Sequence, residues 1–317
     1  MILRGLSAIG SLGSRAIAFS LILGIAVPPL SALMKPLFPV AVFFLLTAAM
    51  VRMDMAAARG VAARPLMLTL AILWSMIAVP FIGTGLVALT GLPDVDEGLA
   101  LAIAMQMAAP PIMSVPAFCF MLGLNGTLAL IMIALSLLVA PITAPLASAI
   151  LLGEALPIAP WSMALRLALY LAGALALALV FRRLVGPGWV ARNNAAIDGF
   201  NVVILFVFAV AIMDGVAVEA INRPLLVIAL VILSFMIACG IIATTWLAFY
   251  RLGNRDSLAL GLSAGNRNMG LMASVLVAGL PDSAWLYFGL AQFPIYFLPW
   301  MMGPLTRRVL KPPRAAV

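Results

Sequence analysis

The sequence contains no histidine, only two cysteines and few charged side chains, and each shortage excludes a class of protein. Without histidine, the chain lacks the commonest metal ligand and the usual proton-relay side chain. Cys119 and Cys239 both lie in apolar runs and imply no disulfide framework. Charged residues make up 9% and hydrophobic residues 66% of the chain, whereas about one quarter of a soluble domain is charged. The composition therefore predicts a polytopic membrane protein.

Apolar runs follow one another along the whole chain, and ten of them are predicted to be transmembrane helices. The first run is expected to be a retained helix, because no convincing small-residue cleavage site follows it. We therefore predict an all-α integral membrane protein. Its spans are residues 16–34, 36–51, 65–90, 97–122, 126–152, 158–180, 195–213, 224–250, 257–279 and 283–305.

Basic residues are divided unequally between the two sides of these spans. The net charge of +8 does not indicate nucleic-acid binding, because the basic residues cluster in short loops, as orientation signals do. If the N-terminus is cytoplasmic, the opposite side holds only Lys35, Arg166 and Arg223 of the 18 basic residues, and Arg267 lies inside a span. This bias predicts a multi-pass protein of the inner (plasma) membrane with both termini in the cytoplasm.

The most unusual stretch is the polar octet at residues 263–270 in the ninth span. Arg267 is the one charged residue between positions 257 and 281. An arginine at bilayer depth costs ~2.5–3.5 kcal/mol on insertion scales and usually marks a substrate or ion pathway. Asn266, Arg267 and Asn268 in succession would cover too wide an arc for one buried helix face. We therefore predict that the octet is the unwound centre of a discontinuous helix.

A second interruption is expected in the fourth span, where Pro110, Pro111 and Pro116 remove backbone donors. The two interruptions lie about half a chain apart. Because five spans per half is an odd number, the second half is predicted to be an inverted copy of the first, with repeats at residues 1–156 and 157–317. Paired interruptions in inverted halves are the best sequence indication of a transporter's midplane site.

The predicted substrate site is formed by both interruptions. Two hypotheses for Arg267 stay open: its guanidinium binds an anion in a bidentate fork, or it is a structural group satisfied by backbone carbonyls. The Gly261-x-x-x-Gly265 motif is expected to let the ninth helix cross the fourth. The candidate binding residues are Ser263, Gly265, Asn266, Arg267 and Asn268 in the ninth span, and Pro111, Met113 and Ser114 in the fourth.

Several motifs resemble those of the bile acid:sodium symporter family, within the wider group of arsenite permeases and auxin carriers. The resemblance implies that the fourth and ninth helices unwind and cross at the midplane. It also implies a core domain, made of spans three to five and eight to ten, that moves against a panel domain of spans one, two, six and seven. The motifs are Leu122-Gly123-Leu124-Asn125, Ala140-Pro141-Ile142-Thr143-Ala144-Pro145 and Gly265-Asn266-Arg267-Asn268-x-Gly270-Leu271.

The sodium ligands that this resemblance implies are largely replaced. Sodium-coupled relatives typically have a glutamate where this chain has Ser263 and a glutamine where it has Arg267. A sodium-binding serine-asparagine pair matches Val115-Pro116, and hydroxyl residues of the fifth span match Ala129 and Ile133. Because hard cations need oxygen ligands, we expect the usual sodium sites to be lost and Arg267 to replace the cations.

The resulting function is predicted to be secondary transport of a small organic anion by alternating access, with no cofactor and with the coupling ion left open. Proton coupling lacks a clear central carboxylate. The alternative is a non-transporting membrane receptor or scaffold that retains the fold. An enzyme is not expected, because no paired carboxylates, histidine cluster or activated nucleophile is visible. Arsenite efflux through Cys119 ranks low, because the surrounding motif does not match. The expected partners are the anion and the lipid bilayer.

Overall fold

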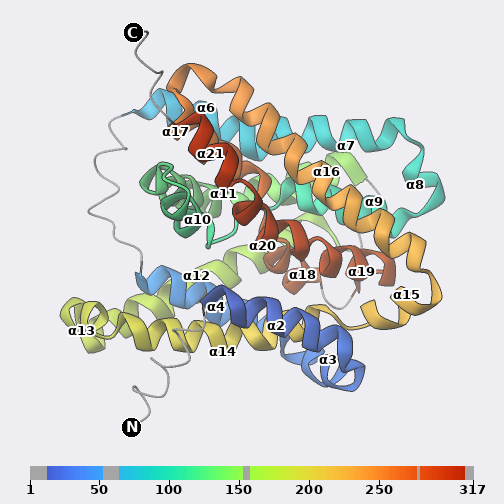
Figure 1. Cartoon of the computed structure of the whole chain (residues 1–317), viewed down its shortest axis with the longest axis horizontal. Coiled ribbons are helices and arrows are strands. Elements are labelled where there is room, and N and C mark those ends of the chain that lie inside the picture. The colour runs from blue at the N-terminus through green and yellow to red at the C-terminus, as the bar shows by residue number, and fades with distance from the viewer. Residues whose placement is uncertain (1–12, 53–63, 153–157, 277–278, 311–317) are drawn as a thin grey trace.

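The computed structural model describes residues 13–52, 64–152, 158–276 and 279–310, and every regular element in these ranges is a helix (Figure 1). The prediction of an all-α membrane protein is confirmed, because six of these helices are long and apolar enough to cross a bilayer. They are Pro28–Arg52, Pro65–Leu89, Gly126–Ile150, Pro160–Val185, Asn194–Asn222 and Pro224–Ala248. The predicted boundary after residue 156 and both chain termini lie outside the described residues.

The helices follow one another with short connections. Up to residue 152, the elements are α2 (Gly13–Ala26), α3 (Pro28–Met34), η1 (Lys35–Leu37), α4 (Phe38–Arg52), α6 (Pro65–Leu73), η2 (Trp74–Ala78), α7 (Val79–Leu89), α8 (Leu92–Val95), α9 (Glu97–Ala108), α10 (Val115–Met121) and α11 (Gly126–Leu152). After it come α12 (Pro160–Val185), α13 (Pro187–Arg192), α14 (Asn194–Ile212), α15 (Val216–Asn222), α16 (Pro224–Ala248), η4 (Tyr250–Leu252), α17 (Asn254–Gly265), α18 (Met269–Leu276), α19 (Asp282–Leu290), α20 (Gln292–Met301) and α21 (Gly303–Val309).

Helix ends follow local chemistry. Helix α11 has the bounds expected from hydropathy. Its first turn is capped by Asn125, whose Oδ1 atom accepts a hydrogen bond from the Leu128 amide at 3.0 Å. The first predicted span is instead divided at Val27, since Pro28 begins a new helix there. The tenth predicted span is likewise divided, at Ala291 between α19 and α20 and at Met302 before α21. Hydropathy alone therefore does not locate breaks inside apolar runs.

Two groups of helices form the molecule. Helices α2, α3, α4, α12 and α14 pack on one another in the lower layer of Figure 1. Helices α6, α7, α9, α11, α16, α17 and α19 form the upper group. Helix α18 lies between the groups and contacts α9 and α19 as well as α4 and α12. The approach is close at Gly270, where a Cβ would lie 2.9 Å from Phe208 Cε2 and 3.5 Å from Val42 Cγ2.

Polar contacts join the two groups on the side predicted to be extracellular. The Lys35 ammonium lies 4.8 Å from the ring centroid of Trp285 in α19 and 2.9 Å from the Asp214 carboxylate. Arg166 Nη1 in α12 donates to the Val275 carbonyl of α18 at 3.1 Å. The groups are therefore held together on this side by cations from the lower group.

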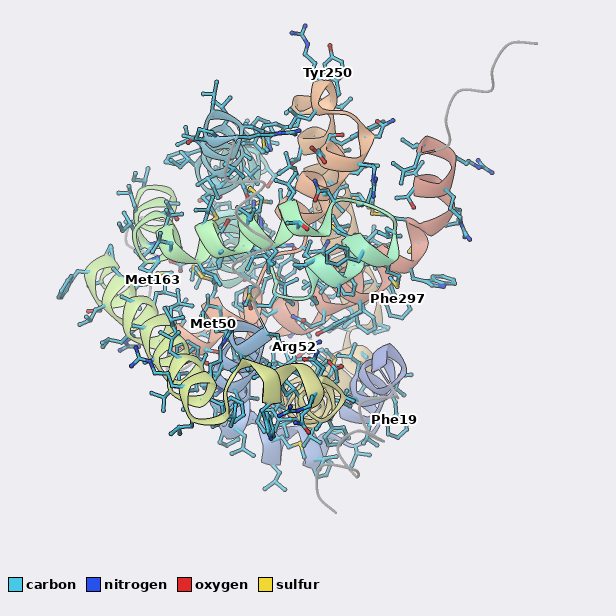
Figure 2. All side chains as sticks on the ribbon, turned by 90° about the vertical axis from the view of Figure 1, so that its left-hand side faces the viewer. Phe19, Met50, Arg52, Met163, Tyr250 and Phe297 are labelled. Atoms are coloured by element: carbon cyan, nitrogen blue, oxygen red, sulfur yellow. The ribbon has the colours of Figure 1, made fainter. Side chains whose placement is uncertain are left out.

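The outer surface is apolar, as a lipid environment requires. Figure 2 shows Phe297 and Phe19 at the right-hand edge of the molecule, one above the other, and these side chains are 43% and 61% exposed. Many more large hydrophobic side chains are exposed along the long helices, and apolar surface of this extent is typical of a protein that faces lipid. The hydrophobic groups of the exterior thus agree with the long apolar helices.

Candidate functional site at the crossing of two broken helices

The breaks in the fourth and ninth predicted spans lie against each other. Residues 109–114 separate α9 from α10, and residues 266–268 separate α17 from α18. The Ile112 amide donates to the Asn266 carbonyl at 2.9 Å, and the Asn268 amide donates to the Pro110 carbonyl at 2.7 Å. These bonds form an antiparallel β-bridge centred on Pro111 and Arg267. Each unwound segment thus satisfies backbone groups of the other where no water can do so.

Arg267 is buried at this crossing and is held by backbone carbonyls. Its side chain is among the largest fully buried ones, with 1% exposure. Nη1 donates to the Ala109 carbonyl and Nη2 to the Ser75 carbonyl, each at 2.8 Å. None of the ion pairs among the described residues includes Arg267. The guanidinium therefore joins three predicted spans through hydrogen bonds to carbonyl oxygens.

The Ser75 carbonyl is available because the third span contains one π-helical turn, at η2. There the Val79 amide donates to the Trp74 carbonyl, five residues earlier. Continuing this register would pair residue 80 with Ser75, but residue 80 is a proline and has no N–H. The freed carbonyl accepts from Arg267 instead. Sequence reasoning missed Ser75, because in an ordinary α-helix Pro80 would free the Met76 carbonyl, and only the π-helical register moves the free carbonyl to Ser75.

The unwound part of the ninth span is shorter than predicted. Ser263 and Gly265 belong to α17, and Gly270 belongs to α18, so only residues 266–268 lie outside helices. Ser263 Oγ donates to the Ala259 carbonyl at 2.8 Å, the back-bond that a serine commonly makes inside a helix. The Leu271 amide donates to Asn268 Oδ1 at 3.0 Å, so Asn268 caps α18 and lets the helix restart at Met269.

The expectation for the Gly261-x-x-x-Gly265 motif was wrong. A Cβ at Gly261 would lie 2.8 Å from the Ile242 carbonyl oxygen, and a Cβ at Gly265 would lie 2.4 Å from Ile242 Cγ1. Both glycines therefore face α16, and they let α17 approach the eighth predicted span rather than the fourth. Small residues permit this kind of close helix approach in membranes.

Several buried polar atoms at the crossing have no hydrogen-bond partner. Asn266 Nδ2 donates to the Leu262 carbonyl at 2.9 Å, but its Oδ1 atom is unpaired. The others in this region are Arg267 Nε, Ser114 Oγ and Ser75 Oγ. Buried polar atoms without a protein partner are free to contact a water molecule, an ion or a ligand. The predicted residues Ser114, Asn266 and Arg267 are thus the ones with unused capacity to bind.

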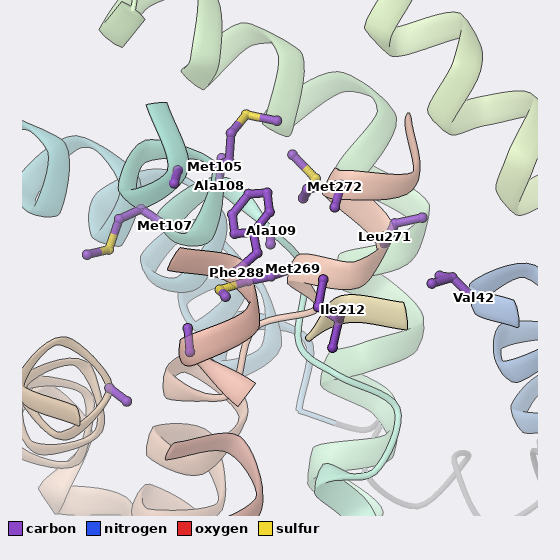
Figure 3. Close-up of a cluster of buried hydrophobic side chains, with 14 of the residues drawn as sticks. Val42, Met105, Met107, Ala108, Ala109, Ile212, Met269, Leu271, Met272 and Phe288 are labelled. Atoms are coloured by element: carbon purple, nitrogen blue, oxygen red, sulfur yellow. The ribbon is translucent and has the colours of Figure 1, made fainter. Parts of the chain in front are cut away.

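The remaining predicted residues differ in their placement. Pro111 is buried and pairs with Arg267 in the bridge, whereas Met113 and Ser114 are half-buried at the end of the break before α10. Figure 3 shows apolar side chains from α9, α18 and α19 around these segments, among them Met105, Met269 and Phe288. This lining lowers the local dielectric and strengthens interactions of the guanidinium. Of the described residues, no group of three or more His, Cys, Asp or Glu could hold a metal ion.

The capping role of Asn268 can be tested by substitution. We expect Asn268→Ala to lower the free energy of unfolding by about 1 kcal/mol, because the first turn of α18 loses its side-chain acceptor. Asn268→Ser should retain most of the stability, since its hydroxyl supplies an oxygen at the same point. Thermal unfolding in detergent measures both variants, with exposed Asn222→Ala as the control. Equal melting temperatures for Asn268→Ala and Asn222→Ala would contradict the assignment.

Comparison with known proteins identifies the family. The model of the Sodium Bile acid symporter family matches residues 39–221, which is more than half of the chain. No curated protein matches the chain. The matched segment includes the break between α9 and α10 and ends before the break that contains Arg267. The resemblance seen in the motifs is thereby confirmed, and the chain belongs to the sodium bile acid symporter family.

Proposed function

We propose that this protein is a secondary transporter that carries a small organic anion across the membrane by alternating access. The observation that carries the proposal is the buried guanidinium of Arg267, which has no carboxylate partner among the described residues and lies where two helix breaks meet. Discontinuous helices that meet in this way build the substrate sites of many transporters. Membership of a transporter family supports the same conclusion.

The proposed architecture has ten spans in two inverted five-helix repeats. The backbone pairing of residues 109–114 with residues 266–268 supports it, because the breaks occur in the fourth and ninth predicted spans. The lower group of helices corresponds to the proposed panel domain and the upper group to the proposed core domain. Both termini are proposed to be cytoplasmic, in the inner (plasma) membrane.

Arg267 is proposed to act as a permanently attached cation in place of sodium. Its Nη atoms use the Ala109 and Ser75 carbonyls, which are oxygen ligands of the kind that sodium would take. Most positions that match sodium ligands in relatives offer no side-chain oxygen, and at Ser263 the hydroxyl donates to the Ala259 carbonyl of its own helix. Val115, Ala129 and Ile133 are all fully buried and supply no oxygen. We therefore expect transport that does not depend on sodium.

The anion is proposed to bind on the side of the crossing where polar atoms remain unpaired. Arg267 Nε and Ser114 Oγ have donors to offer, and Asn266 Oδ1 can accept from a protonated or hydroxylated part of the substrate. The guanidinium provides the positive charge, and the carbonyls fix its position. Substrate binding would then satisfy groups that are otherwise buried without partners.

Uptake into proteoliposomes tests this function. Purified protein would be assayed with radiolabelled monocarboxylates and one bile acid, with external sodium or with N-methylglucamine in its place. We expect saturable uptake of at least one anion that differs less than twofold between the two cations. A loss of more than tenfold without sodium would contradict the attached-cation role. Stabilisation by an anion without any uptake would support the receptor alternative and overturn transport.

A further inference from the structure

A cavity lies away from the crossing, within the lower group of helices. Its volume is about 300 Å³, and its wall is formed by α4, α12, α13 and α14. None of its lining residues belongs to α9, α10, α17 or α18, so the transport site does not account for it. The wall is made of Phe44, Thr47, Ala48, Val51, Leu177, Phe181, Trp189, Ala196, Ile197 and Phe200.

The wall is apolar in character and built from aromatic pairs. Phe44 and Phe200 meet edge to face with ring centroids 6.2 Å apart, and Phe181 and Trp189 do so at 5.8 Å. The only hydroxyl in the wall, on Thr47, donates to the Phe43 carbonyl of its own helix at 2.9 Å. The cavity therefore offers no polar partner that would hold water, and cavities of this kind are occupied by apolar groups or stay dry.

The cavity reaches the surface that faces lipid. Phe200 is 36% exposed and Leu177 39% exposed, although both contribute to the wall. Trp189 lies on α13, the six-residue helix that connects the ends of α12 and α14. Tryptophan is enriched at the membrane–water interface. A hydrocarbon chain can thus enter from the bilayer with its polar end near α13.

Arginines follow the wall on one end of the same helices. Arg52 comes directly after Val51 and pairs with Asp198 at 2.6 Å (Figure 2, where Arg52 is labelled). Arg182 follows Phe181 and donates to the Val51 carbonyl at 3.2 Å. Arg183 and Arg192 are exposed at the ends of α12 and α13. Among the described residues at this end, the arginines outnumber the one acidic residue, Asp198, so their summed charge is positive.

We propose that this cavity binds one acyl chain of an anionic phospholipid, with the lipid phosphate at the arginines around Arg192. Basic pockets between transmembrane helices on the cytoplasmic side are typical sites for anionic lipid head groups, and the arginines lie on the side predicted to be cytoplasmic. The apolar wall fits an acyl chain, and the excess of arginine over acidic side chains among the described residues of this end favours a negatively charged head group. Neither feature depends on the substrate of the transporter.

Lipid-dependent thermal unfolding tests the proposal. The purified protein in detergent would be titrated with phosphatidylglycerol or phosphatidylcholine that carry the same acyl chains. We expect phosphatidylglycerol to raise the melting temperature by about 3 °C or more beyond phosphatidylcholine, as tight binding to the folded state alone would do. Equal effects of the two lipids would overturn the proposal. So would an equal shift produced by glycerol 3-phosphate, because that ligand has no acyl chain.

Variants separate the two halves of the site. Ala48→Leu and Ala196→Leu each add an isopropyl group to the cavity, from α4 and α14. Each is expected to remove most of the additional melting-temperature shift that phosphatidylglycerol produces. The double variant Arg183→Gln/Arg192→Gln should reduce the phosphatidylglycerol-dependent shift in melting temperature at least twofold. Arg251 is an exposed arginine between α16 and α17, and Arg251→Gln should leave this shift unchanged. A phosphatidylglycerol effect that survives both leucine variants, or that Arg251→Gln reduces equally, would contradict the assigned place of binding.

Discussion

Replacing Arg267 with methionine is expected to destabilise the protein more than any other single change at the crossing. The substitution leaves the Ala109 and Ser75 carbonyls buried without donors. Each unsatisfied buried acceptor costs about 1–3 kcal/mol, so the free energy of unfolding should fall by about 3 kcal/mol or more. Arg267→Lys should recover little of it, because a single ammonium lacks the planar fork that reaches two carbonyls at once.

Thermal unfolding in detergent and anion uptake in proteoliposomes measure this effect together. Arg251→Met is the matched control. Arg251 is exposed, and its Nε atom donates to the hydroxyl of the neighbouring Tyr250. We expect the control to melt close to the unmodified protein and to retain uptake. An Arg267→Met protein as stable as the control would show that the carbonyl contacts contribute little, and the attached-cation role would lose its basis.

Gly261→Val is expected to have the second large effect, by separating α17 from α16. A Cβ at this position would lie 2.8 Å from the Ile242 carbonyl oxygen, which is a backbone atom and cannot turn away as a side chain can. Overpacking in a close-packed region costs about 1–3 kcal/mol and more where backbone has to move. We expect a loss of about 3 kcal/mol in the free energy of unfolding.

Gly240→Val provides the matched control for this substitution. Gly240 lies on α16, the partner helix, and a Cβ there would meet nothing within 4 Å. Both changes place the same β-branched residue in a helix, so they share the same change in helix propensity. The difference between the two melting temperatures therefore measures the contact between α17 and α16. If Gly261→Val and Gly240→Val melt together, the two helices do not need the close approach.

Sequence reasoning located the helices where hydropathy was decisive. Helix α11 begins and ends where the apolar run does, and Asn125 caps its start. The break at Arg267 was also predictable, since three polar residues in succession cannot face one buried surface. Membership of the family followed from short motifs on both sides of these features. The bounds of α11, the break at Arg267 and the family motifs each depend on residues that are close together in the sequence, so they could be predicted without the structure.

Partner choice between helices was not predictable in the same way. Gly261 and Gly265 were expected to face the fourth span, but they face Ile242 and Ala238 of α16. All candidate neighbours are apolar, so hydropathy does not distinguish them, and association in lipid depends on shape. The Ser75 carbonyl was missed for a related reason. A backbone atom becomes part of a site only when its helix changes register, which side-chain patterns do not report.

The paired backbone of the two breaks restricts how the molecule can move. Two hydrogen bonds join the breaks, from the Ile112 amide to the Asn266 carbonyl and from the Asn268 amide to the Pro110 carbonyl. Breaking either bond would leave polar backbone groups unpaired in the apolar interior. The four half-helices α9, α10, α17 and α18 are therefore expected to move as one rigid unit. Under the proposed alternating access, this unit would move past the lower group of helices at Gly270, which lies against Phe208 and Val42. Such a movement would have to break the side-chain contacts that join the two groups, namely Lys35 with the Trp285 ring and Arg166 with the Val275 carbonyl.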